Sequence, residues 1–336
     1  MDNVVELQDV EVTFKVRQSF IKELISKSNE LVRAVDGVNL EIRHGEILSL
    51  VGESGSGKTT LGKAILNLVE KTGGKVLFQH QEVDYTNRKA LQQFRRKAQI
   101  IFQDPYESLN PKSLIIDIVA EPLEVHGLVK SEEERKTAVI KALEDAGLEP
   151  AEQYLYRYPY ELSGGQRQRV AIAGALVLNP EFIVADEPVS MLDVSIRTGI
   201  LNLLLQLKEK KGLSFLFITH DLSLAWLISD RIAIMYLGKI LEIGRGDDII
   251  NAPKHPYTNA LLQVMPIPEV NKNRVRKVLQ GEAPNPANIP EGCRFHPRCP
   301  YAYDRCSREE PNHHQVAEGH LVACHLMEGK GTGAKT

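Results

Sequence analysis

One stretch of the sequence constrains this 336-residue chain most: residues 52–59 read GESGSGKT. They match the phosphate-binding pattern G-x-x-x-x-G-K-[ST] at every fixed position. The apolar run 46–51 before it predicts a buried strand, and residues 61–68 after it predict a helix. In a strand–loop–helix arrangement of this kind, the loop N–H groups and the positive end of the helix dipole point toward one bound anion. A glycine-rich turn without a ligand is the alternative, and the complete motif in its context disfavours it.

The loop also predicts which side chains contact a nucleoside triphosphate. Lys58 can reach the β- and γ-phosphates, and the Thr59 hydroxyl can ligate Mg²⁺. The other nucleotide-binding residues that we expect in this stretch are Gly52, Ser54, Gly55, Gly57 and Thr60.

A second anion-binding pattern is Leu162-Ser163-Gly164-Gly165-Gln166, which stands before a helical pattern. Ser163 is a typical N-cap residue, and the two glycines open the backbone for another anion contact. One nucleotide does not need two such sites in one chain. The second pattern makes sense if it serves the nucleotide of another subunit.

With both motifs, the chain resembles the ATP-binding cassette ATPases, whose signature sequence is LSGGQ. The resemblance covers residues 4–250 and includes every diagnostic motif in the expected order. It implies ATP hydrolysis by two cassettes packed head to tail. Each ATP then lies between the phosphate loop of one subunit and the signature motif of the other. By this resemblance, the partner's ATP is contacted by Ser163, Gly165 and Gln166.

The remaining motifs suit the same site. Residues 182–185 form an apolar strand pattern that ends in two adjacent acids. Polar residues at a solvent-exposed strand end are the alternative, which two carboxylates after a buried run disfavour. The resemblance implies that Asp186 holds Mg²⁺ through water and that Glu187 polarises the attacking water. Asp193 resembles part of the loop that crosses to the partner subunit.

Three further site residues come from the resemblance. His220 follows the strand pattern 213–219 and matches the family's γ-phosphate contact, with an ordinary surface histidine as the alternative. Gln103 resembles the glutamine that contacts Mg²⁺ and the attacking water. Phe14 resembles the aromatic residue that stacks on adenine; a place in a strand core is the alternative, and Phe20 lies nearby.

Composition narrows the class of protein. With 43% hydrophobic residues, the chain can bury one large domain and an appendage. A net charge of −3 gives no reason to expect a nucleic-acid partner. No run of about 18 apolar residues is free of charge, and the N-terminus lacks a signal pattern. We expect a peripheral protein on the cytoplasmic face of the cell membrane.

Alternating strand and helix patterns predict an α/β fold with a mainly parallel core sheet. The resemblance makes it a P-loop NTPase cassette with an antiparallel β part and a helical subdomain at about residues 104–165. We expect a nucleotide-binding domain at residues 1–250 and a loop-rich C-terminal extension at residues 251–326. A disordered tail is expected at residues 327–336.

Three stretches closely resemble the ATPases of dipeptide, oligopeptide and nickel importers: residues 101–111, 255–262 and 292–300. With a polar insert at 15–33, they resemble the second of two paired ATPase subunits. This implies a heterodimer with a different ATPase, two transmembrane permease subunits and an external solute-binding protein. The solute is a peptide, nickel or an oligosaccharide. The alternatives are a non-transport ABC ATPase, which usually has two cassettes or a long coiled-coil insertion, and a metal-binding regulatory protein.

All cysteines lie in the last 44 residues: Cys293, Cys299, Cys306 and Cys324. Their spacing matches no common zinc pattern, and a reducing compartment disfavours disulfides. Four thiolates can hold zinc or an iron–sulfur cluster. The importer resemblance implies a [4Fe–4S] cluster, while His296 and His325 keep a mixed-ligand Zn²⁺ site as the alternative. The segment lies outside the nucleotide motifs, and we expect it to take no part in hydrolysis.

Three positions depart from the family pattern: Gly174, and Val189 and Met191, which replace the usual Thr and Ala. Gly174 stands where these ATPases usually carry Arg, in the helix after the signature motif. Glycine in a helix interior costs about 1 kcal/mol relative to alanine. No catalytic group is removed, so ATPase activity is still expected.

Overall fold

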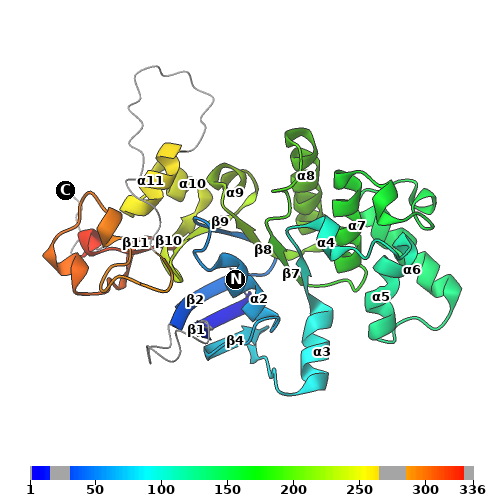
Figure 1. Cartoon of the computed structure of the whole chain (residues 1–336), viewed down its shortest axis with the longest axis horizontal. Helices are drawn as coiled ribbons and strands as arrows, with labels where there is room; N and C mark the ends of the chain where they lie inside the picture. The colour runs from blue at the N-terminus through cyan, green and yellow to red at the C-terminus, as the bar shows by residue number, and fades with distance from the viewer. Residues whose placement is uncertain (1, 16–30, 265–284, 329–336) are drawn as a thin grey trace, which may run out of the picture. The chain divides into compact units, whose positions relative to one another are not determined.

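The computed structural model describes residues 2–15, 31–264 and 285–328 (Figure 1). Contacts divide the chain into two compact units. Unit 1 comprises Met1–Glu6, Glu41–Ile47 and Leu77–Ile218, and unit 2 comprises Leu7–Leu40, Leu48–Val76 and Thr219–Thr336. Residues 16–30 of the predicted insert and residues 329–336 of the predicted tail lie outside the described residues.

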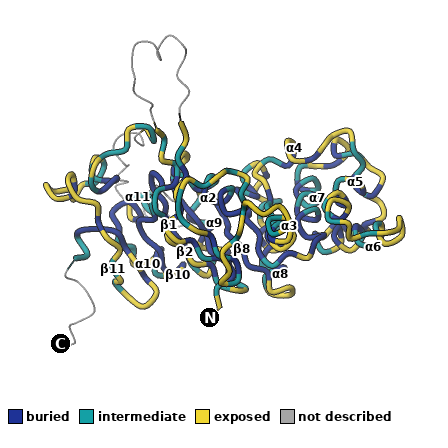
Figure 2. Tube along the Cα trace, turned by 90° about the horizontal axis from the view of Figure 1, so that it is seen from below, coloured by how far each residue is buried: buried dark blue, intermediate teal, exposed yellow. Residues whose placement is uncertain are grey.

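The core of unit 1 is a parallel sheet. Strand β7 (Phe182–Asp186) lies between β6 (Ala98–Ile101) and β8 (Ser214–Thr219), and both pairings are parallel. Every residue of β7 and β8 is buried, as Figure 2 shows for β8. Continuous apolar runs of this kind are typical of parallel strands that are covered on both faces. The prediction of a parallel core is confirmed.

Three helices of unit 1 pack on one another: α5 (Ile115–Val125), α6 (Glu132–Asp145) and α7 (Gly164–Leu176) (Figure 1). Arg135 of α6 is only 12% exposed and forms ion pairs with Asp117 and Glu124 of α5. The charged start of α6 therefore contributes to helix packing as well as to solubility. Unit 1 also contains α3 (Arg88–Lys97), α4 (Pro105–Ser108), α8 (Val194–Lys211), β5 (Gln81–Glu82), η1 (Ala151–Gln153) and η2 (Pro159–Glu161).

Unit 2 contains most of a second sheet. In it, β1 (Asn3–Lys15) lies between β2 (Leu31–Arg43) and β4 (Gly73–Phe78), as Figure 1 shows. The buried valines of β1 alternate with exposed residues along part of the strand, which suits a sheet with one covered face.

In unit 2, the strands of the eight-stranded sheet that also contains β6, β7 and β8 join the phosphate-loop strand to the C-terminal extension. Strand β3 (Ile47–Val51) pairs parallel with β9 (Arg231–Tyr236), which pairs antiparallel with β10 (Lys239–Arg245). A hairpin from the extension, β11 (His313–Ala317) and β12 (His320–Ala323), continues the sheet through an antiparallel pairing of β12 with β10. The extension is thus built onto the sheet that carries the loop.

A buried carboxylate strengthens this junction. Glu242 of β10 accepts hydrogen bonds from His320 Nε2 at 2.7 Å and from the N–H groups of Lys254 and His255 at 2.7 and 3.0 Å. Burial opposes ionisation of Glu242, but these hydrogen bonds outweigh it and hold its pKa below the usual value. The ionised carboxylate therefore ties strand β12 and the chain before α11 to β10.

An aromatic cluster fills the core of unit 2 beside this sheet. The rings of Tyr236, Tyr257 and Phe295 are almost wholly buried, with centroids 4.7–5.5 Å apart. The remaining elements of unit 2 are α2 (Lys58–Ile65), α9 (Leu222–Ile228), α10 (Gly246–Asn251), α11 (Pro256–Val264), η3 (His296–Arg298), η4 (Asp304–Ser307) and η5 (His325–Met327). Among the helices of the described residues, none is both long enough and apolar enough to cross a membrane.

Candidate functional site

The phosphate loop connects β3 to α2, as the sequence predicts. Gly57 ends the loop with φ +103°, in the region that favours glycine. A Cβ atom at Gly57 would overlap the carbonyl oxygen of Ala34, and one at Gly52 would overlap that of Met235. Both positions therefore require glycine for close backbone approach, and Gly57 requires it for its backbone conformation as well.

The Lys58 ammonium is buried at the centre of the loop. Its Nζ atom donates to the carbonyl oxygens of Gly52 and Glu53, both at 2.8 Å, and to Ser56 Oγ at 3.2 Å. Phosphate oxygens would be stronger partners for this charge than neutral carbonyls. Thr59 and Thr60 follow, half-buried, in the first turn of α2. This arrangement can bind the phosphates of a nucleotide.

In unit 1, two predicted catalytic residues meet. Gln103 follows β6, and its Nε2 atom donates to Glu187 Oε2 at 3.2 Å. Glu187 follows β7 with φ +45°, and its N–H donates to the carbonyl oxygen of Ile218 at 2.9 Å. A non-glycine residue in this region is strained, a feature that clusters at functional sites. Asp186, one residue earlier, is buried at the end of β7.

The signature motif begins helix α7. Ser163 Oγ accepts from the Gln166 N–H at 3.3 Å, and Gln166 Oε1 accepts from the Ser163 N–H at 3.0 Å. This reciprocal capping box confirms Ser163 as the N-cap. Gly165 is buried beside Ile196 of α8, while Ser163 is exposed. Asp193, also exposed, is the N-cap residue of α8.

Two other predicted residues belong to unit 2. His220 is exposed and directly follows β8. Phe14, near the end of β1, is 42% exposed, so its side chain is not part of a strand core. An exposed aromatic ring is available for stacking. The phosphate loop also belongs to unit 2, whereas Gln103, the two acids and the signature motif belong to unit 1.

The four cysteines line one small cavity of unit 2 together with His255, His296 and His325. Burial raises the pKa of Cys293 and Cys299, and raises that of Cys324 to about 11. Without a metal, these three thiols are therefore protonated at neutral pH. Within the described ranges, no three or more His, Cys, Asp or Glu side chains have an arrangement that could hold a metal ion.

The two histidines of the zinc alternative are engaged elsewhere. His325 Nδ1 lies 2.9 Å from Glu328 Oε1, and its Nε2 lies 2.9 Å from the carbonyl oxygen of Glu309. His296 Nδ1 lies 2.9 Å from the carbonyl oxygen of Cys293. A histidine ligand needs a free ring nitrogen, so these hydrogen bonds count against His325 as a ligand.

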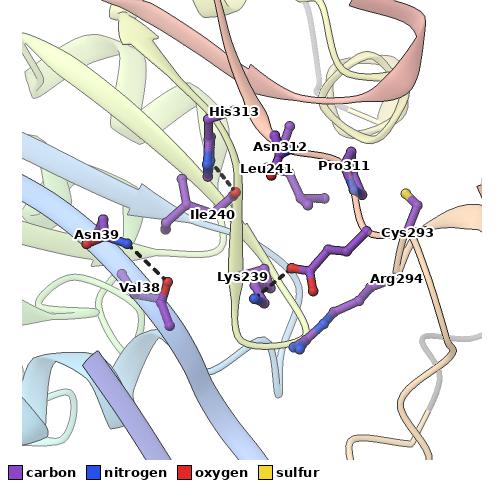
Figure 3. Close-up of a pocket in the computed structure, with 13 residues that line it drawn as sticks. Val38, Asn39, Lys239, Ile240, Leu241, Cys293, Arg294, Pro311, Asn312 and His313 are labelled. Carbon is purple, nitrogen blue, oxygen red and sulfur yellow. Dashed lines mark hydrogen bonds and ion pairs between the residues drawn. The ribbon is translucent and has the colours of Figure 1, made fainter. Parts of the chain in front are cut away.

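Sequence reasoning missed a cavity of about 270 Å³ in unit 2, shown in Figure 3. The charged groups that line it are paired. Lys239 forms an ion pair with Glu310 at 2.6 Å, and Arg294 donates to Asp36 and to the carbonyl oxygen of Leu237. No phosphate-loop residue lines the cavity. Its residues come from distant parts of the chain, so no local pattern marks it.

The family model described as "ABC transporter" matches residues 35–190, and "Oligopeptide/dipeptide transporter, C-terminal region" matches residues 241–306. Putative oligopeptide transport ATP-binding protein YkfD of Bacillus subtilis (strain 168) is 48% identical over 90% of this chain and 92% of that protein. Oligopeptide transport ATP-binding protein AppF of the same strain is 43% identical over 97% of this chain and 98% of that protein.

Solved structures agree with these relatives. The ATP-binding cassette MJ0796, in a dimeric post-hydrolysis state bound to ADP and Pi, superimposes with a TM-score of 0.62 at 32% identity. The match covers 72% of this chain and 98% of that one. For cbiO1 from Clostridium perfringens, part of the ABC transporter complex cbiONQ, the TM-score is 0.62 at 26% identity. That match covers 75% of this chain and 92% of that one.

Proposed function

This chain belongs to the ABC transporter ATPases of the oligopeptide-importer type, and from that premise we propose how its residues power peptide import. The chain is an ATP-hydrolysing enzyme. The observation that carries the proposal is the pair of local sites that ATP hydrolysis needs. One is the buried Lys58 ammonium in the phosphate loop, and the other is the Gln103–Glu187 contact at the end of β7.

We assign the roles as follows. Lys58 and the N–H groups of the loop bind the β- and γ-phosphates, and Phe14 stacks on adenine. Thr59, Gln103 and Asp186 would hold Mg²⁺, which would neutralise phosphate charge. Glu187 polarises the attacking water while Gln103 orients that carboxylate through their hydrogen bond. His220 contacts the γ-phosphate.

The assembly that we propose follows from the signature motif. Ser163, Gly165, Gln166 and Asp193 act on ATP held by a second ATPase subunit. The exposed N-cap of α7 supports this role, as does the dimeric structure of the cassette MJ0796. The partner is a different, paired ATPase, and two permeases and an external solute-binding protein complete the importer. The chain acts at the cytoplasmic face of the membrane. The relatives are named as peptide-transport proteins, which favours an importer ATPase over a non-transport ATPase.

The test compares ATP hydrolysis by the isolated chain with hydrolysis after addition of the paired ATPase and permeases in vesicles. We expect slow turnover alone and a large increase on assembly, because the signature motif completes the site of the other subunit. Ser163→Arg should block the increase by placing a bulky cation at the N-terminus of α7. Full activity of this chain as an ATP-dependent homodimer would show that the heterodimer is wrong.

For the cysteines, the proposal is one [4Fe–4S] cluster with Cys293, Cys299, Cys306 and Cys324 as ligands. All four line one cavity, and thiolate sulfur is the donor that such clusters use. Binding would require loss of the four thiol protons. The cluster would crosslink the segments around η3, η4 and η5. The hydrogen bonds of His325 make zinc the second candidate.

Metal analysis of protein purified without oxygen tests this assignment. We expect brown protein with about four irons and four sulfides per chain. Cys299→Ser should lose the colour and render the extension sensitive to proteases, whereas the control Ser307→Ala, at an exposed position of η4, should retain both. Stoichiometric zinc without acid-labile sulfide would overturn the cluster.

A further inference from the structure

We infer that Arg298, in the C-terminal extension, is a positioning residue for the phosphate loop and sets the affinity of this ATPase for ATP. Arg298 ends η3, next to Cys299. Its partner, Glu53, is the second residue of the GESGSGKT loop. The two residues stand 245 positions apart in the sequence.

The contact between them is a partly desolvated ion pair. Arg298 Nη1 donates to Glu53 Oε1 at 3.2 Å and to Oε2 at 3.0 Å. The Arg298 side chain is 7% exposed and that of Glu53 is 27% exposed. Reduced exposure to water weakens screening, so this pair restrains its members more than a surface pair would.

Arg298 is itself held in place. Its Nη1 atom lies 3.4 Å from the Tyr236 hydroxyl, and its guanidinium carbon lies 5.9 Å from the centre of the Tyr236 ring. The Arg298 N–H donates to the carbonyl oxygen of Phe295 at 3.0 Å. Arg298 therefore presents its charge to Glu53 from the rigid aromatic cluster of unit 2.

The extension also holds the backbone of Glu53. The Glu53 N–H donates to the Tyr257 hydroxyl at 3.1 Å, and Tyr257 is wholly buried in α11. The carbonyl oxygen of the same residue accepts from Lys58 Nζ at 2.8 Å. Glu53 is thus restrained at its side chain and its N–H by the extension, and at its carbonyl by the phosphate-binding lysine.

This chain of contacts links the folding of the extension to the geometry of the loop. A loop that is already ordered loses less conformational freedom when phosphate binds, so it binds more tightly. Release of Glu53 would let the loop sample other conformations and misplace the Gly52 and Glu53 carbonyls that orient Lys58. The cysteine segment, which lies outside the nucleotide motifs in sequence, is joined to them in the structure.

The test is equilibrium binding of Mg-ATP to the full-length chain. We expect Arg298→Gln to weaken binding on the order of tenfold, the effect of one charge-assisted contact. The matched control is Arg308→Gln, which removes the same charge from an exposed position of the same segment and should bind normally. Arg298→Lys should restore only part of the affinity, because an ammonium lacks the planar fork of guanidinium.

A double-mutant cycle distinguishes positioning from general damage to the fold. Glu53→Gln alone should reproduce the weakened binding without altering the extension. The double variant should bind no more weakly than either single variant, because both remove one interaction. In the assembled transporter, KM for ATP should rise while turnover at saturating ATP falls much less.

Additive losses in the cycle, or equal affinity in Arg298→Gln and Arg308→Gln, would overturn the inference. If Arg298→Gln does not fold, Glu53→Gln and Tyr257→Phe still decide it, since each releases Glu53 in a different way. Binding is measured on the chain alone, so the result is independent of the solute that the importer carries.

Discussion

In the proposed mechanism, a single carboxylate, Glu187, separates ATP binding from ATP hydrolysis. Its Oε2 atom accepts from Gln103, and its backbone is fixed in a strained conformation by the Ile218 carbonyl. The Lys58 contacts belong to a different motif, so binding and hydrolysis should respond to different substitutions.

Glu187→Gln should bind ATP with near-normal affinity and lose turnover by about 100-fold or more, because an amide cannot polarise water. Lys58→Ala should instead weaken ATP binding, since it removes a charge-assisted phosphate contact. Affinity and hydrolysis are measured separately on both variants in the assembled transporter. Near-normal hydrolysis by Glu187→Gln would contradict the role of this residue.

Individual residues also show how far the sequence can be interpreted. Lys58 and the Ser163 N-cap are predictable because each motif is a short run with its own local geometry. The exposure of Phe14 is not predictable, because an aromatic residue in a strand pattern can lie either in the core or on the surface. The partner of Glu53 is invisible in the sequence, because Arg298 reaches it only through the folded extension.

At the scale of elements, α7 shows what the departure at Gly174 means. Gly174 lies inside this helix, and a Cβ atom there would meet nothing within 4 Å. Gly212, by contrast, ends α8 with φ +65°, a left-handed conformation that also has open space around it. Each glycine has free space around it, but only Gly212 has a left-handed backbone conformation.

We therefore expect opposite effects from one substitution. Gly174→Ala should raise the free energy of unfolding by about 0.5–1 kcal/mol through helix propensity. Gly212→Ala should lower it by about 1 kcal/mol, because Cβ is strained in the left-handed region. Denaturant midpoints of the two variants, measured beside the wild type, provide the comparison. A shift of both midpoints in one direction would show that backbone conformation does not decide the outcome.

Elements also differ in how well the sequence predicts them. The apolar runs of β3, β7 and β8 are evident because parallel strands are buried on both faces. The β11–β12 hairpin is not evident: the residues of β11 are exposed or half-buried and carry little apolar pattern, and the place of the hairpin depends on the distant strand β10. Non-local pairing and the buried Glu242–His320 contact therefore decide the fold of the extension.

For the whole molecule, the order of motifs predicts the family, and the relatives confirm it. The loop and the cysteine cavity belong to unit 2, while the carboxylates and the signature motif belong to unit 1. Each half of the proposed catalytic machinery thus belongs to its own compact unit. We propose that ATP hydrolysis by this machinery drives peptide import.

Uptake of a labelled oligopeptide into vesicles tests whether ATP hydrolysis by this chain drives import. The vesicles carry the two permeases, the paired ATPase and this chain on the ATP side, with the solute-binding protein on the other side. We predict uptake that requires ATP, rises together with hydrolysis and is lost with Glu187→Gln in this chain. ATP hydrolysis at the full rate without any peptide uptake, or uptake unchanged by Glu187→Gln, would show that hydrolysis by this chain does not drive peptide import.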